Sequence, residues 1–158
     1  MKLPKRDVLL LCQLRKNARE PLTNMSRETR IPVSTLYDRL RHFERSSVIR
    51  KHTSLIDFSI FGYSVKAYFQ LKTKPSARNK IRVYLTNHQN INNLYRVNNN
   101  CDFIAEGIFR TITECEDFVD ELDERFELKS IETYYVIQEI KREGFLSNKQ
   151  LLPILIKK

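Results

Sequence analysis

The spacing of apolar residues changes near residue 48, and this change limits the fold more than any other feature of the chain. Before it, apolar residues recur every three or four positions, which predicts helices over about 4–16, 22–29 and 32–46. Three short helices with tight connections form a compact trihelical unit. After it, β-branched and aromatic residues become frequent and alternate with polar ones, which is typical of strands.

From residue 65 the order of elements is β-α-β-β-α-β. Strands are expected over 65–72, 91–97, 102–111 and 130–141, and helices over 77–88 and 114–127. Three consecutive asparagines between the second and third strands suit a tight turn, because Asn tolerates left-handed backbone. The second helix has a T-x-x-E capping box, predicted at Thr113 and Glu116. This order predicts an α+β ferredoxin-like domain, with both helices on one face of an antiparallel sheet.

These patterns divide the chain into four parts. A trihelical helix-turn-helix domain is expected over 1–50, a linking strand or hinge over 51–64, the ferredoxin-like domain over 65–141 and a C-terminal tail over 142–158. The tail contains the apolar run "LLPILI", which either packs back on its own sheet or serves a subunit contact. Pro153 argues against a central strand or a continuous helix there.

The net charge of +9 is unevenly distributed. Residues 1–54 contain 13 lysines and arginines against 5 aspartates and glutamates, whereas the remainder contains 15 against 14. A chain made basic only for solubility would spread this excess. The asymmetry therefore favours a polyanion-binding module joined to a nearly neutral one.

The third expected helix has an apolar face and a basic face. Leu36, Leu40 and Phe43 share the buried side, and Arg39 falls close to it. We therefore expect Arg39 to be structural, with its stem packed and its head on a carboxylate or the backbone. The side chains expected to face DNA are Ser34, Thr35, Tyr37, Asp38, Arg41, His42 and Arg45. Further phosphate contacts are expected from Lys5, Arg27, Arg30, Arg50 and Lys51.

Any helix on a protein surface has a charged face, so solvation alone is the alternative explanation of these arginines. A solvated face usually mixes Glu with Lys and Arg, whereas this one is mainly Arg. The helix is also the third of a basic trihelical unit and follows a short helix and a tight turn. In that position a helix can enter the major groove, where Arg donates two hydrogen bonds to guanine.

From about Leu3 to Phe145 the chain resembles the Lrp/AsnC family, the feast/famine transcription regulators. "LRKNAR" resembles the end of the family's first helix, and "STLYDRLRHFERSSVI" its recognition helix and exit. "SLIDFSIFGYSVKAYFQL" is similar to the linking strand and the entry into the effector domain. "LYRVNNNCDFI" resembles that domain's strand-turn-strand, with Asp102 on the motif's Asp.

The chain departs from the family pattern at three turns. The pattern's Gly-Leu-Ser is Arg30-Ile31-Pro32, the Gly after the recognition helix is Ser47, and the Gly before the motif's Asp is Asn99. Pro32 can begin a helix although it cannot cap one as Ser does, and Ser34 is a rival cap. Asn99 can adopt the turn's backbone but adds a side chain where an amino-acid effector would bind.

The resemblance implies a homodimer formed through the sheet domains, which assembles further into a tetramer or octamer. Its two recognition helices would meet successive major grooves of a pseudo-palindromic operator in double-stranded DNA. It also implies a small-molecule effector site at the turn, formed by Asn98, Asn99, Asn100 and Asp102. The function expected is sequence-specific transcription regulation.

Two other functions compete with this one. A non-specific chromatin-type protein would use the same charge without reading bases. A siroheme-decarboxylase-like enzyme would share the architecture, but would call for a His- and Arg-rich motif where only His52 stands. We therefore expect no catalytic residue, no cofactor and no metal.

Cysteine content and hydropathy bear on the compartment. Cys12, Cys101 and Cys115 are odd in number and form no CxxC pair, which argues against a disulfide framework or a cysteine zinc site. No window reaches the roughly 18 apolar residues of a membrane span. We expect a cytoplasmic protein that does not enter membranes.

Overall fold

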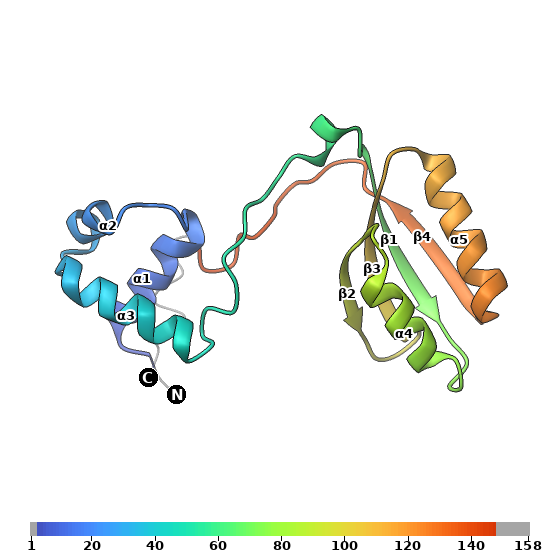
Figure 1. Ribbon diagram of the computed structural model, residues 1–158, viewed down its shortest axis with the longest axis horizontal. Coiled ribbons are helices and arrows are strands. Elements are labelled where there is room, and N and C mark those ends of the chain that lie inside the picture. Colours follow the sequence, from blue (N-terminus) through green and yellow to red (C-terminus); the bar gives the residue numbers. More distant parts are fainter. Residues whose placement is uncertain (1–2, 148–158) are drawn as a thin grey trace. The chain divides into compact units, whose positions relative to one another are not determined.

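A computed structural model describes residues 3–147, and the chain divides into two compact units (Figure 1). Of the described residues, the helical unit contains 3–55 together with 140–147, and the sheet unit contains 56–139. The run "LLPILI", for which packing on the sheet or a subunit contact was expected, lies outside the described residues. In the part that is described, no helix is both long and apolar enough to cross a bilayer.

The helical unit is built from α1 (Lys5–Lys16), α2 (Leu22–Thr29) and α3 (Val33–Arg45). All three predicted helices are confirmed, to within one residue at each end. Their shared core is Leu10, Met25, Leu36 and Phe43, each almost completely buried. Because every helix contributes an apolar side chain to one cluster, removal of this surface from water holds the three short helices together.

Helix α3 begins and ends without the residues that usually mark such ends. Pro32 precedes it, and no side chain caps its first turn, so Ser34 does not act as the rival cap. At the exit Ser47 adopts the left-handed conformation (φ 57°), which glycine normally occupies. The turn is closed by the Ile49 N–H, which donates to the Phe43 carbonyl oxygen at 3.0 Å.

The left-handed Ser47 leads to a stability prediction. The left-handed conformation destabilises a non-glycine residue by roughly 1–2 kcal/mol, and glycine would remove this strain. Glycine also gives the unfolded chain more conformational entropy, which cancels part of the gain. Ser47→Gly should therefore raise the free energy of unfolding by about 1 kcal/mol in urea titrations. Ser46→Gly is the matched control, because Ser46 has φ −86° and gains nothing from glycine. Equal effects at both positions would contradict this explanation.

The sheet unit contains four strands and two long helices. In chain order these are β1 (Val65–Lys72), α4 (Arg78–Asn87), β2 (Ile91–Arg96), β3 (Phe103–Phe109), α5 (Ile112–Phe126) and β4 (Ser130–Tyr135). The strands pair antiparallel in the order β2-β3-β1-β4. Alternate residues of β1 and β3, such as Phe69 and Phe109, pack against Ile81 of α4 and Phe118 of α5. The predicted α+β ferredoxin-like fold is confirmed.

The linking strand expected over 51–64 is the exception. This segment contains no strand, only a short 3₁₀ turn over Phe58–Phe61. Its β-branched and aromatic residues favour a strand. A strand forms, however, only where a neighbouring strand pairs with its backbone N–H and C=O groups. The last strand is shorter than predicted for the same reason. Ala67 pairs with Tyr135, and beyond that position β1 has almost no residues left to pair.

The predicted capping box is wrong by two residues. Thr111, not Thr113, precedes α5, and its hydroxyl accepts a hydrogen bond from the Glu114 N–H at 3.1 Å. The Glu114 carboxylate in turn accepts from the Arg110 N–H at 2.8 Å. The stretch "TITECE" contains two overlapping T-x-x-E patterns, and the sequence alone does not separate them.

Candidate nucleic-acid interface

The residues predicted to face DNA lie on the outward side of α3. Leu36 and Phe43 are only 1% exposed on the opposite side, so the helix is amphipathic as its spacing predicts. Thr35 is half-buried, and the exposed members of the set are Ser34, Tyr37, Asp38, Arg41, His42 and Arg45. The fold thus brings them together along one helix face.

Two arginines on this face carry donors that the fold does not use. The Arg41 guanidinium lies over the Tyr37 ring, 5.4 Å from its centroid, which orients both side chains on the helix surface. Neither Arg41 nor Arg45 lies within 4.0 Å of a carboxylate oxygen in the described part of the chain. Their N–H groups are therefore available to an external acceptor.

Arg39 behaves differently, as predicted. Its Nε donates to Asp7 Oδ1 at 2.9 Å, and its Nη2 contacts the other carboxylate oxygen. The Asp7 side chain has no exposed surface, and the Arg39 guanidinium also lies 5.2 Å from the centroid of the Phe43 ring. Arg39 is a structural residue that joins α3 to α1.

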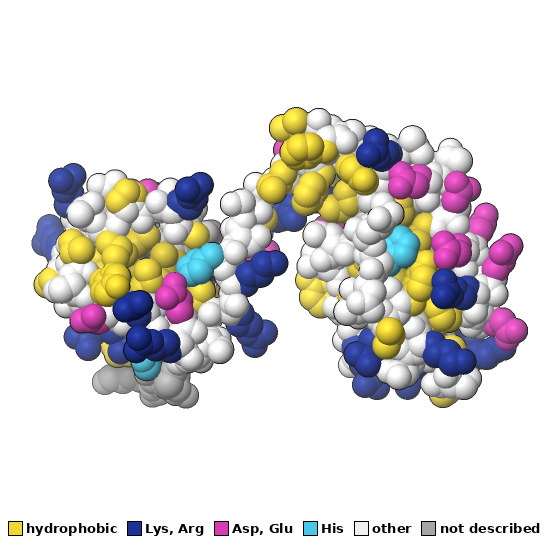
Figure 2. Space-filling model, viewed as in Figure 1, with side chains coloured by type: hydrophobic (Ala, Val, Ile, Leu, Met, Phe, Trp, Pro, Cys, Tyr) yellow, Lys and Arg dark blue, Asp and Glu magenta, His cyan; other side chains and the backbone are white. Residues whose placement is uncertain are grey.

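The surroundings of α3 are basic. The five residues predicted to contact phosphates are all exposed, namely Lys5, Arg27, Arg30, Arg50 and Lys51. Two carboxylates of the helical unit have internal partners: Glu44 pairs with His52 at 3.0 Å, and Glu143 pairs with Arg15 at 2.6 Å. Figure 2 shows Lys and Arg side chains around this unit. In the same view, acidic side chains gather over α5 of the sheet unit.

The predicted effector turn is only partly open to a ligand. Asn98, Asn99 and Asn100 are exposed between β2 and β3, and Asn99 adopts the expected left-handed backbone (φ 73°). Asp102, however, is buried. Its Oδ2 accepts from the Thr73 N–H at 2.9 Å, and its Oδ1 accepts from Arg78 Nη2 at 2.7 Å. The Asp102 carboxylate thus ties this turn to the segment between β1 and α4.

This arrangement predicts how the stability of the sheet unit depends on pH. The Thr73 N–H, supported by Arg78 and Lys72, lowers the pKa of Asp102 below its ordinary value of 3.8. A carboxyl group with a depressed folded-state pKa stabilises the fold above that ordinary value and loses the contribution as pH falls. Asp102→Asn should therefore unfold more easily than the parent at pH 6 and differ less from it near pH 2, as followed by thermal melts. A constant difference across this range would contradict the role of the charge.

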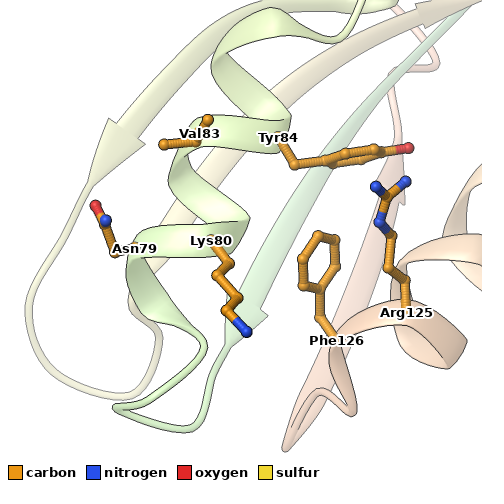
Figure 3. Close-up of a pocket in the computed structure, with 6 residues that line it drawn as sticks. All are labelled: Asn79, Lys80, Val83, Tyr84, Arg125 and Phe126. Carbon is orange, nitrogen blue, oxygen red and sulfur yellow. The ribbon is translucent and has the colours of Figure 1, made fainter.

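A groove lies elsewhere, on the outer side of the helix layer. It has a volume of about 540 Å³ and is lined by Lys80, Val83 and Tyr84 of α4 with Arg125 and Phe126 of α5 (Figure 3). The Tyr84 hydroxyl donates to Glu121 at 2.8 Å. Burial, with this bond, raises the pKa of Tyr84 to about 12, so the phenol stays protonated at neutral pH. None of the predicted effector residues lines this groove.

Family comparison assigns the sheet unit. Residues 66–146 match the model described as the Lrp/AsnC ligand binding domain. The HTH-type transcriptional regulator FL11 of Pyrococcus horikoshii is 26% identical over 114 residues, which cover 72% of this chain and 76% of FL11. The FL11 of Pyrococcus abyssi is 26% identical over 107 residues, covering 68% and 71% of the two chains.

Solved structures share the same architecture across both units. The transcriptional regulator NMB0573 of Neisseria meningitidis, in complex with L-Met, superposes with a TM-score of 0.82 at 17% identity, covering 89% of this chain and 94% of that chain. LrpC of B. subtilis gives 0.80 at 20% identity, covering 89% and 99%. Because the family model alone matches more than half of the residues, this chain belongs to the Lrp/AsnC family of transcriptional regulators.

Proposed function

We propose that this chain is a sequence-specific DNA-binding transcriptional regulator, which binds a pseudo-palindromic operator as a dimer or a higher oligomer. The observation that carries the proposal is the division of arginines on α3. Arg39 is bound to the buried Asp7, whereas Arg41 and Arg45 are exposed with donors available. Arg41 and Arg45 thus present donors with no partner in the described chain on one exposed face, which is what a helix that reads guanine in the major groove requires.

The proposed binding mode follows from this face. Ser34 and Thr35, near the start of α3, reach base edges in the major groove, and Arg41 and Arg45 donate paired hydrogen bonds to guanine. The surrounding cations contact phosphates and set the register of the helix without reading sequence. Each phosphate contact releases counterions, so binding weakens steeply with salt.

The free face of the sheet supports the dimer. Both helices pack on one side, and the other side of the strands exposes large side chains, including Tyr68 (37%) and Tyr134 (49%), which are register partners on β1 and β4. Between them and β2 lies Glu106, whose carboxylate accepts hydrogen bonds from Tyr68, Asn92 and Asn93. A second copy on this face would place two recognition helices on one pseudo-symmetric site.

We place the contact with a small-molecule effector at the exposed asparagines of the β2–β3 turn. The NMB0573 structure is a complex with L-Met. In this chain Asn98, Asn99 and Asn100 are exposed, whereas the Asp102 carboxylate accepts hydrogen bonds from Thr73 and Arg78. We do not assign an enzymatic activity, since the matching relatives are named as regulators and His52 is bound to Glu44. A regulator of this kind acts in the cytoplasm.

In vitro selection from a random DNA pool tests the proposal. We expect an enriched inverted repeat, with a log–log salt dependence that corresponds to several phosphate contacts. Competition then separates the two DNA-binding functions: random DNA should compete at least 10³-fold less well than the selected site. If random and selected DNA compete equally, the chain is a chromatin-type binder instead.

A further inference from the structure

Helix α1 buries two separate faces. Leu10 points into the core shared with α2 and α3, but Val8 and Cys12 belong to a different apolar cluster. These two residues are one turn apart and only 5% and 2% exposed. Leu146, which is more than 130 positions away along the sequence, is partly buried and packs against this cluster, as do Leu3 and Leu9. The second face of α1 is thus covered in part by a segment that follows the whole sheet unit.

Arg15 holds this segment in place by three polar contacts. Its Nη2 donates to the Glu143 carboxylate at 2.6 Å and to the Glu143 carbonyl oxygen at 3.0 Å, and its Nε donates to the Phe145 carbonyl oxygen at 3.2 Å. Glu143 and Leu146 both have positive φ, which non-glycine residues seldom adopt. The combination of these turns with the Arg15 contacts fits the segment to α1. We call residues 143–147 the strap.

The strap changes how the helical unit is tethered. Two segments of chain join the two units, one following Leu55 and one preceding Ile140 (Figure 1). If the strap were loose, only the first would restrain the helical unit. Because the strap is fixed to α1, the second segment restrains it as well. A unit held by two tethers has fewer accessible orientations than a unit held by one.

We infer that the strap determines which half-site spacing the dimer accepts, with Arg15, Glu143 and Leu146 as positioning residues. This inference rests on the proposed function, because spacing has a meaning only for a dimer on paired half-sites. The restraint removes orientations that would fit wrongly spaced half-sites. Specificity for spacing then comes from residues that do not face the DNA.

The first test measures strap docking without DNA. In a Cys101→Ser background, Cys12 and Cys115 are 2% and 0% exposed, so both thiols should react slowly with an aromatic disulfide reagent. Leu146→Asp should make one thiol react at least tenfold faster, and mass spectrometry should identify it as Cys12. Leu146→Ala should have the same effect in milder form, while circular dichroism shows both variants folded. A Cys12 that reacts fast in the background protein, or slowly in both variants, would overturn the docking.

The second test measures spacing on DNA. The parent should lose about tenfold or more in affinity when about 5 bp, half a helical turn, are inserted between selected half-sites. Arg15→Glu should bring the affinities for the two spacings to within about threefold of each other. Lys16→Glu, the control with the same charge change on the same helix, should weaken both sites and keep the parent's ratio. The exchanged pair Arg15→Glu with Glu143→Arg should restore only part of the ratio, because a glutamate at position 15 cannot donate to the carbonyl oxygens of Glu143 and Phe145.

Arg15→Glu could make Cys12 reactive and still keep the parent's ratio of affinities for the two spacings. That result would falsify the positioning role while leaving DNA binding intact. Failure of the selection to enrich any sequence would instead overturn the proposed function, and the spacing role with it. The thiol measurement would still report whether the strap is docked. The two failures are therefore distinguishable.

Discussion

Replacing Arg41 and Arg45 together by alanine is expected to abolish specific DNA binding and to leave the fold and the dimer intact. Each paired arginine–guanine contact contributes about 1–3 kcal/mol of discrimination, so operator affinity should fall on the order of 10²-fold or more. The fold should tolerate the change. The exposed Arg41 lies over the exposed Tyr37 ring, and exposed substitutions usually change stability by less than about 0.5 kcal/mol.

The matched control removes the same charge from a surface outside α3. Lys16→Ala with Arg19→Ala lowers the net charge by the same amount, and both residues are exposed in or just after α1. This pair should weaken selected and random DNA alike, whereas the α3 pair should weaken the selected site far more than random DNA. Fluorescence anisotropy at one salt concentration measures both, with circular dichroism as the check on folding. Unchanged operator affinity in the α3 variant would rule out this face as the reading surface.

The sequence was sufficient for those features that depend on local periodicity. The three N-terminal helices and the β-α-β-β-α-β order follow from apolar spacing, since burial of one face dominates the energy of each element. The same projection separated Arg39 from Arg41 and Arg45. It could not identify the partner of Arg39, because Asp7 lies on another helix and has no signature of burial in the sequence.

The sequence did not reveal several contacts that the fold makes. The strap joins Arg15 to Glu143 and Phe145, and local periodicity cannot reveal contacts between residues that are 128 or 130 positions apart. Asp102 was expected to meet a ligand but accepts hydrogen bonds from Thr73 and Arg78, because the turn between β2 and β3 lies beside the segment after β1. Ser47 is left-handed although the sequence places no glycine there.

The largest stability effect is expected at Arg39. The Asp7 carboxylate has no exposed surface, so Arg39→Met would leave a buried charge without its partner. Breaking a buried pair from one side usually destabilises by about 3–5 kcal/mol, which is comparable to the whole stability of a small helical unit. The helical unit of the variant should therefore unfold at much lower urea concentration. Arg41→Met, the same substitution two residues further on, should change the midpoint little.

A double substitution separates charge from packing. Asp7→Leu with Arg39→Met removes both charges and keeps apolar volume between α1 and α3, so most of the lost stability should return. Full-chain urea titrations followed by circular dichroism and tyrosine fluorescence can resolve the two units, because all but one of the tyrosines lie outside the helical unit. Equal losses in Arg39→Met and the double variant would mean that the cation–π contact with Phe43, not the buried pair, holds α3 in place. If stability recovers but operator binding does not, the Asp7–Arg39 pair also sets the orientation of α3 relative to α1 within the helical unit.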